Sequence, residues 1–308
     1  MAPSHRMSWT EWGLLVLLSL LWGGSFFFAK IAVGTLPPLT VVLARVWLAA
    51  LALGLFLRLR GTQVPASQHL WLSFAGMGLL NNILPFSLIF WGETVLPSGL
   101  ASILNATTPL FSLLAAHALT EDEKLTLNKL AGIALGFTGV MGLAGEQALD
   151  GARGNLLPIL ACLGAALSYG LASVFGRRFR RMGIAPSLGA FGQLAASALM
   201  MLPIAALADA PWRLPAPGLL VCGALVGLAL LSTALAYILF FRLLATAGAI
   251  NTSLVTLLIP VSALLLGTLL LGEPLSTGQL GGMALIAAGL IALDGRVLAA
   301  ARARVRPG

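Results

Sequence analysis

The chain has 308 residues, of which 59% are hydrophobic and 9% are charged, and its mean hydropathy is +0.98. Soluble domains carry about 25% charged residues, so this composition excludes a soluble globular protein. The net charge of +8 is typical of some nucleic-acid-binding proteins, but here the basic residues lie in short connections between apolar runs. This placement argues against a nucleic-acid partner and predicts a lipid bilayer as the surroundings of the chain.

The apolar runs are long and continuous, as spanning helices of about 20 residues require. An outer-membrane barrel would instead show alternating segments of about 10 residues. The sequence therefore predicts an all-α membrane protein with ten transmembrane helices, near residues 12–33, 39–58, 70–91, 97–118, 127–145, 155–176, 185–208, 217–241, 248–271 and 277–295. The first run follows an arginine, as in a signal peptide, but it has no small-residue cleavage site, so we expect it to be retained.

Basic residues mark every second connection between the predicted helices. By the positive-inside rule, these connections lie in the cytoplasm, and both termini are predicted to be cytoplasmic. The residues on which this depends are Arg6, Arg58, Arg60, Lys124, Lys129, Arg177, Arg178, Arg180, Arg181, Arg242, Arg296, Arg302, Arg304 and Arg306.

An internal repeat divides the chain into two halves. The stretch PSGLASILNATTP at 97–109 returns, much altered, as GAINTSLVTLLIP at 248–260, which places Pro260 151 residues (260 minus 109) after Pro109. Five helices per half is an odd number, so the second half must cross the membrane in the opposite sense. We therefore predict two inverted five-helix repeats, residues 1–149 and residues 150–308.

The repeat extends to further pairs of residues. The alignment of the halves pairs Trp22 with Tyr169, Gly23 with Gly170, Phe86 with Tyr237, Gly132 with Gly282, and Gly139 with Gly289. The glycine pairs are predicted to allow a close approach of helices.

Polar residues occur near the middle of the first, third and fourth helix of each half. Hydrocarbon offers them no partner, so we expect these six helices to surround a cavity, with the second and fifth helices of each half outside it. The predicted substrate-binding residues are Trp22, Ser25, Phe26, Asn81, Asn82, Phe86, Asn105, Thr108, Tyr169, Tyr237 and Thr256. The asparagines would orient the polar end of a small amphipathic substrate, and the aromatic rings would hold its side chain.

Each of these residues also has a purely structural interpretation. Serine and threonine in a membrane helix commonly bond back to a carbonyl one turn earlier, and the aromatic rings can serve only to pack helices together. Pro85, Pro109 and Pro260 are predicted hinges at cavity depth, although a proline also bends a helix for shape alone.

Lys30 and Arg45 are the charges nearest to the hydrocarbon, and both are predicted near the outer end of their helices. They either snorkel to the interface or line an outer vestibule. The ten acidic residues all lie at helix ends or in loops. Coupled carriers commonly keep a carboxylate at depth, so we expect an uncoupled carrier. His117 is expected at the cytoplasmic interface.

The chain lacks the patterns of an enzyme. No two aspartates lie at depth for an aspartyl protease, no histidine lies within reach of a mid-membrane serine, and no cluster of histidine, cysteine and carboxylate predicts a metal site. We expect neither a metal nor another cofactor. A receptor would gain nothing from an inverted duplication, whereas a carrier gains two related gates.

These residues resemble a known family. The stretch LWGGSFFFAK at 21–30, the segment from Pro37 and Pro38 to Arg45, the two proline-bearing helices and LLLGEPLS at 269–276 are similar to the EamA branch of the drug/metabolite transporter superfamily, most of all to its YddG-type amino-acid exporters. The likeness extends from about residue 12 to residue 297. The chain departs from repeat symmetry where Gln193 takes the place of Arg45 and where EDEKLT replaces GEPLS, so matching charged gates are not expected.

The resemblance implies a multi-pass inner-membrane exporter with a cavity between helices 1, 3, 4, 6, 8 and 9. It suggests aromatic or other neutral amino acids as substrates. With the uncoupled transport expected from the acidic residues, we predict export by alternating access through this cavity. The alternative is an exporter of cationic drugs or other metabolites, with proton coupling as a further option. The expected partners are a small-molecule substrate and the bilayer, and the protein is expected to be a monomer.

Overall fold

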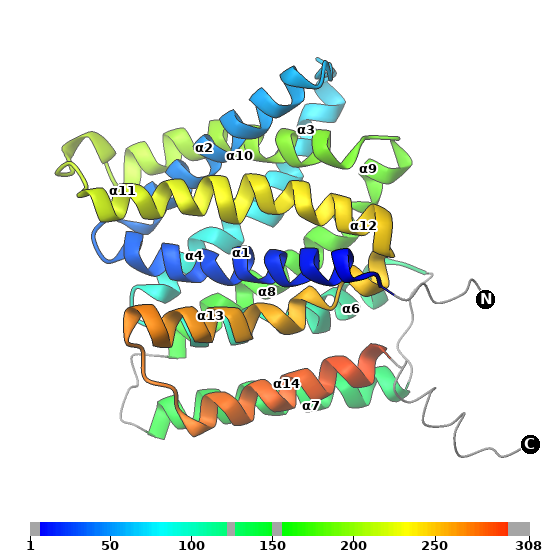
Figure 1. Cartoon of the computed structure of the whole chain (residues 1–308), viewed down its shortest axis with the longest axis vertical. Coiled ribbons are helices and arrows are strands. Elements are labelled where there is room, and N and C mark those ends of the chain that lie inside the picture. Colours follow the sequence, from blue (N-terminus) through cyan, green and yellow to red (C-terminus); the bar gives the residue numbers. More distant parts are fainter. Residues whose placement is uncertain (1–6, 122–126, 150–155, 295–308) are drawn as a thin grey trace, which may run out of the picture.

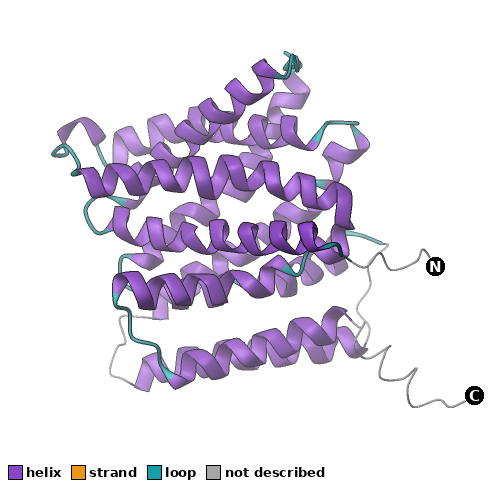
Figure 2. Ribbon diagram, in the orientation of Figure 1, coloured by secondary structure: helices purple, strands orange, loops and turns teal. Residues whose placement is uncertain are grey.

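The computed structural model describes residues 7–121, 127–149 and 156–294. Within these ranges all regular structure is helical, as Figure 2 shows. The helices of the first half are α1 (Trp9–Val33), α2 (Pro38–Leu59), α3 (Gln68–Gly78), η1 (Leu79–Ile83), α4 (Leu84–Glu93), α5 (Ser98–Asn105), α6 (Thr108–Leu119) and α7 (Leu127–Leu149). Those of the second half are α8 (Leu156–Phe175), α9 (Arg177–Arg181), α10 (Pro186–Ala208), η2 (Pro211–Arg213), α11 (Leu219–Val226), η3 (Gly227–Leu235), α12 (Ala236–Thr252), α13 (Val255–Leu271) and α14 (Thr277–Asp294).

The described helices confirm the predicted class of an all-α membrane protein. Seven helical stretches are long and apolar enough to cross a membrane, and Leu130–Met141 and Val255–Leu271 are shorter apolar helices. The predicted span 127–145 coincides with α7, and the predicted span 277–295 coincides with α14. The predicted span 248–271 corresponds to the end of α12 together with α13. Ten crossings, the inversion and the location of the termini stay predictions.

The long helices lie side by side and their ends gather on two faces of the molecule (Figure 1). We call the face on which α1 begins the N-side, on the right in Figure 1, and the opposite face the far side. Turns of a few residues on the far side join α1 to α2 and α4 to α5. The sequence sets these boundaries: Ser8 and Glu11 form a capping box at the start of α1, and Pro38 and Ser98 each open a helix directly after a proline.

The third helix of each half contains a π-helical segment at mid-depth. In the first half this segment is η1, just before Pro85, a residue that has no N–H for the carbonyl of Asn81. Adding the repeat distance of 151 residues to Leu79–Ile83 gives 230–234, which falls within η3 (Gly227–Leu235). The second half has no proline at the matching place, so the π-helical turn recurs without the proline. π-Helical turns are rare and are common at functional sites.

The fourth helix of each half is interrupted. In the first half α5 ends at Asn105 and α6 begins at Thr108, with Pro109 as its second residue. In the second half the backbone kinks at Gly248 (φ 80°, ψ 166°) within α12, so the last residues of α12, up to Thr252, begin the fourth helix and α13 continues it from Val255. The interruption between Thr252 and Val255 therefore precedes Pro260, which lies inside α13. The helices are therefore broken near both prolines, although the proposed hinge motion itself stays a prediction.

The glycine pairs lie where helices touch. A Cβ atom on Gly23 of α1 would come within 2.6 Å of the Cβ atom of Ser262 in α13, and one on Gly170 of α8 would come within 2.8 Å of the backbone of Phe111 in α6. Each first helix thus packs on the fourth helix of the other half. A Cβ on Gly139 of α7 would meet the carbonyl oxygen of Gly282 in α14 at 2.8 Å, and these two helices pack together at one edge, at the bottom of Figure 1.

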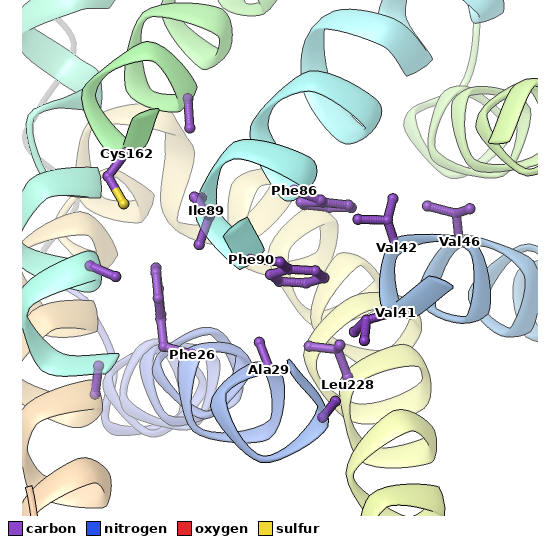
Figure 3. Close-up of a cluster of buried hydrophobic side chains, with 14 of the residues drawn as sticks. Phe26, Ala29, Val41, Val42, Val46, Phe86, Ile89, Phe90, Cys162 and Leu228 are labelled. Atoms are coloured by element: carbon purple, nitrogen blue, oxygen red, sulfur yellow. The ribbon is translucent and has the colours of Figure 1, made fainter. Parts of the chain in front are cut away.

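A cluster of aromatic and β-branched side chains fills the space between α1, α2 and α4. Phe86 and Phe90 of α4 stack with ring centroids 6.1 Å apart. Figure 3 shows them beside Val41 and Val42 of α2, with Phe26 of α1 nearby. Phe90, near the end of α4, and Val41, near the start of α2, place this buried cluster toward the far side of the bundle.

Candidate functional site

A cavity of about 440 Å³ lies inside the bundle. Its walls come from both halves of the chain, including all six helices that the sequence predicted to surround it. The predicted residues in its wall are Trp22, Ser25, Phe26, Asn81, Phe86, Asn105, Thr108, Tyr169, Tyr237 and Thr256. Their contact with a substrate stays a prediction, but the structure brings them to one place.

Asn82 is the predicted binding residue that does not line the cavity. Its side chain has no exposed surface, and its amide donates to Ser197 Oγ of α10 at 3.0 Å. One residue step turns a helix by about 100°, so Asn81 and Asn82 face different neighbours. Asn82 joins two helices, and the structure gives no support to a substrate contact.

The second helix of each half also contributes to the cavity, which corrects the prediction that these helices lie outside it. Arg45 of α2 and Gln193 of α10 both line the wall. The sequence does indicate that these two residues are related, because the repeat pairs the position of Gln193 with that of Arg45. Among the described side chains, none of those lining the cavity comes from the fifth helices, α7 and α14.

Two polar contacts cross between the halves at the level of the π-helical turns. In one, the amide of Asn81 donates to Gln193 Oε1 at 3.0 Å and to the hydroxyl of Tyr237 at 3.2 Å. In the other, Arg45 Nε donates to Thr233 Oγ1 at 3.0 Å. Each joins a second helix to the third helix of the opposite half, so the two contacts are related by the repeat although their chemistry differs.

Further lining residues were not predicted as binding residues. They have apolar or single hydroxyl side chains, which do not stand out in an apolar helix. They are Met77, Ile89, Phe90, Ser102, Ala106, Ser112, Ser173, Ser232, Thr233, Phe240, Phe241 and Ile259. Trp22 and Phe240 are in ring contact at 5.4 Å, and Tyr237 stacks on Phe241 at 5.9 Å.

The cavity opens toward the N-side and is closed on the far side. Ser173, close to the N-side end of α8, lines the cavity and is exposed. Toward the far side the wall consists of Arg45, Phe90 and Ser102, all buried, and every residue from 98 to 104 is buried as well.

A polar cluster continues this closure beyond the cavity. Lys30 does not line the cavity but donates to the carbonyl oxygens of Glu93 and Leu96, at 2.6 and 2.8 Å, where α4 ends. Glu273, in the turn after α13, accepts from the backbone N–H of Ser98, from its hydroxyl and from the N–H of Gly99, at 2.8, 2.8 and 3.2 Å. A carboxylate at the start of α5 is favourable for the helix dipole, and it links the two halves.

Glu93 lies at a helix end, as predicted, but it is not solvent-exposed. Its side chain has no exposed surface, and neither carboxylate oxygen has a hydrogen-bond partner among the described residues. The sequence predicted that Glu93 lies at the end of its helix. Whether its side chain is buried depends on neighbouring residues from other helices, which the sequence does not show. The prediction that the acids lie at helix ends or in loops holds for Glu93, but this helix end is not exposed to solvent.

Metal-binding clusters were not expected. Across residues 7–121, 127–149 and 156–294 no group of three or more His, Cys, Asp or Glu side chains is arranged to hold a metal ion.

A bundle of membrane-spanning helices around a polar and aromatic cavity that opens to one side is typical of membrane transport proteins. Residues 10–145 and 156–293 each match the EamA-like transporter family, and the chain belongs to this family. The two matches lie on either side of the predicted boundary between residues 149 and 150, and the division into two halves stays a prediction.

Several relatives share most of the chain. It is 32% identical over 267 residues to the "Uncharacterized inner membrane transporter YedA" of Escherichia coli K12, covering 86% of this chain and 84% of that protein. It is 27% identical over 281 residues to the "Uncharacterized transporter YoaV" of Bacillus subtilis, covering 90% and 94%. It is 29% identical over 291 residues to a "Probable amino-acid metabolite efflux pump" of Salmonella typhimurium, covering 92% and 94%.

A solved structure described as "Crystal structure of protein" has the same fold, with a TM-score of 0.64 at 20% identity over 91% of this chain and 96% of the other. The predicted location, as a multi-pass protein of the inner membrane, agrees with these findings.

Proposed function

We propose that the protein exports small amphipathic metabolites, above all aromatic and other neutral amino acids, by alternating access through the central cavity. The observation that carries this proposal is the mixed wall of the cavity, in which Trp22, Tyr169 and Tyr237 stand beside the amides of Asn81 and Asn105. Aromatic rings favour an apolar side chain, and convergent amides orient a polar end. A relative is described as a probable amino-acid metabolite efflux pump.

The arrangement of the halves supports alternating access. In the proposed cycle, the N-side is cytoplasmic and the observed structure is open to the cytoplasm. The far-side contacts of Lys30 and Glu273 then break as the N-side closes. All cavity walls come from one chain, so a monomer is the proposed working unit.

Transport by purified protein in liposomes tests the proposal. Vesicles preloaded with unlabelled tryptophan or phenylalanine should take up the same labelled amino acid faster than vesicles without protein. An excess of other neutral amino acids should compete, whereas organic cations such as tetraphenylphosphonium should not. If organic cations alone compete, the protein is an exporter of cationic drugs and the proposed substrate class is wrong.

We further propose that transport is uncoupled, because none of the described residues that line the cavity has an acidic side chain. Glu93 is the specific observation that favours the alternative, proton-coupled transport, since it is a carboxylate buried close to the closed end of the cavity. For an uncoupled carrier, an imposed pH gradient should leave exchange unchanged within about twofold, and Glu93→Gln should transport at a comparable rate. Accumulation that needs a pH gradient and is lost in Glu93→Gln would establish coupling instead.

A further inference from the structure

Among the residues that the structure describes, Arg45 is the one charged residue in the cavity wall. Its side chain is 6% exposed, so nearly all of it lies within the bundle. Arg45 lies about seven residues after the start of α2, which places its Cα roughly 10 Å below the far-side end of that helix. This is deeper than the vestibule position that the sequence suggested.

Neighbouring groups fix the orientation of the guanidinium. Nε donates to Thr233 Oγ1, whose hydroxyl in turn donates to the carbonyl oxygen of Leu228 at 2.8 Å. The central carbon of the guanidinium lies 3.7 Å from the centroid of the Phe86 ring, a cation–π contact. The hydroxyl of Thr233 and the ring of Phe86 both contact the group, so its position is established before any ligand arrives.

The protein leaves most of the guanidinium donors without a partner. An arginine has five N–H donors, and within the described residues only the donor on Nε has an acceptor. Among the described residues, no carboxylate forms an ion pair with Arg45 and no acidic side chain lines the cavity wall. Glu93, a buried carboxylate outside that wall, interacts with Arg45 electrostatically but accepts none of its hydrogen bonds. A buried charge without a hydrogen-bonded partner of opposite charge is costly, and an anionic ligand in the cavity would lower that cost.

We infer that Arg45 is the anchor for the carboxylate of the transported molecule. This assignment rests on the proposed function and makes it more specific: the substrates are amphipathic carboxylates, with the carboxylate on Arg45 and the apolar part toward Tyr237 and Phe240. A guanidinium matches a carboxylate by two parallel hydrogen bonds. Gln193, at the related position of the other half, is neutral, so the site holds one carboxylate.

A series of ligands that share one aromatic ring tests the inference on the wild-type protein. Phenylalanine and 3-phenylpropionate both keep a carboxylate, whereas phenylalanine methyl ester and phenethylamine do not. In competition with labelled phenylalanine, the two carboxylates should inhibit, and the ester and the amine should be at least tenfold weaker. Equal inhibition by phenethylamine and 3-phenylpropionate would overturn the assignment.

Substitutions of Arg45 provide a second test of the inference. Arg45→Gln introduces the residue found at the related position and should raise the KM for phenylalanine by at least tenfold, while Arg45→Lys, which keeps the charge but loses the two-bond geometry, should raise it less. Arg58→Gln removes the same charge from an exposed position on the same helix and serves as the matched control.

If Arg45→Gln transports phenylalanine with an unchanged KM, Arg45 is not the anchor and the proposed export of amino acids still stands. If the wild-type protein transports no carboxylate at all, the proposed function itself fails. The comparison of ligands on the wild-type protein decides the question even where a variant does not fold.

Discussion

At the scale of single residues, Asn81 and Asn82 show how adjacent amides serve different purposes. Asn81 lines the cavity and donates to Gln193 and Tyr237, whereas Asn82, also in η1, is buried and donates to Ser197 of α10. Two adjacent polar residues on a helix cannot both face one cavity. Asn81 is expected to contact the substrate, and Asn82 joins η1 to α10.

Exchange of each asparagine for alanine should separate these purposes. A net hydrogen bond contributes about 1 kcal/mol, so Asn81→Ala should raise the KM for a neutral amino acid by about three- to tenfold, given that about 1.4 kcal/mol corresponds to tenfold. Asn82→Ala should leave KM within about twofold of the wild type. Equal changes of KM in the two variants, measured by uptake into liposomes, would contradict the division.

Local sequence patterns predicted that polar residues gather around a central cavity. They did not predict which charged side chains are buried in the bundle. Ten of the proposed binding residues reached the cavity because hydroxyls, amides and rings at mid-depth have few other places to go. Arg45 was expected to snorkel or to line an outer vestibule, and Glu93 was expected at a helix end, where it does lie. The burial of both side chains was not predicted, because it depends on contacts with other helices. Such contacts, as between Arg45 and Thr233, 188 residues apart, leave no local signal in one sequence.

At the scale of helices, the repeat is visible in the packing of α1 and α8. Gly23 and Gly170 occupy paired positions, and each brings a first helix against the fourth helix of the other half. The two recurring π-helical turns and the two broken fourth helices follow the same relation. The sequence predicted the helices and their pairing, since apolar length and glycine spacing are local. It did not predict the π-helical turns, because their extra residue per turn has no characteristic composition.

Gly23→Ala tests the close approach of α1 and α13. The added methyl group would lie 2.6 Å from Ser262 Cβ and 2.9 Å from the backbone nitrogen of Ala263, and overpacking of this kind costs about 1–3 kcal/mol. The thermal unfolding midpoint in detergent should therefore fall.

Gly13→Ala, in the same helix, is the matched control, because a Cβ there meets no atom within 4 Å. Alanine favours a helix over glycine by about 1 kcal/mol, so this variant should be as stable as the wild type or more so. A Gly23→Ala protein that unfolds at the wild-type temperature would show that the two helices do not pack as closely as described.

At the scale of the whole molecule, the one-sided cavity and the far-side cluster are two aspects of one conformation. The N-side is open at Ser173, while the far side is closed by buried rings and by the bond between Glu273 and the start of α5. A carrier must be able to reverse this arrangement. Contacts on the closed side therefore set how often the far side opens.

Cysteine labelling can measure this asymmetry. In a Cys222→Ser background, which removes the exposed native thiol, a membrane-impermeant maleimide should react with Ser173→Cys in inside-out vesicles and scarcely in right-side-out vesicles. Ser102→Cys, buried in the far-side wall, should react poorly from outside. Preferential labelling of Ser173→Cys in right-side-out vesicles would place the N-side outside the cell and make the predicted topology wrong.

Glu273→Gln then tests the closure itself. The substitution keeps the size of the side chain but replaces charge-assisted bonds to Ser98 and Gly99 by neutral ones. Bonds to an ionised acceptor contribute about 1.5–3 kcal/mol and neutral ones about 1 kcal/mol, so the closed state should lose roughly 1 kcal/mol. A change of that size corresponds to about a fivefold shift in the population of open molecules. Labelling of Ser102→Cys from outside should accelerate by a similar factor, whereas an unchanged rate would mean that Glu273 does not hold the far side closed.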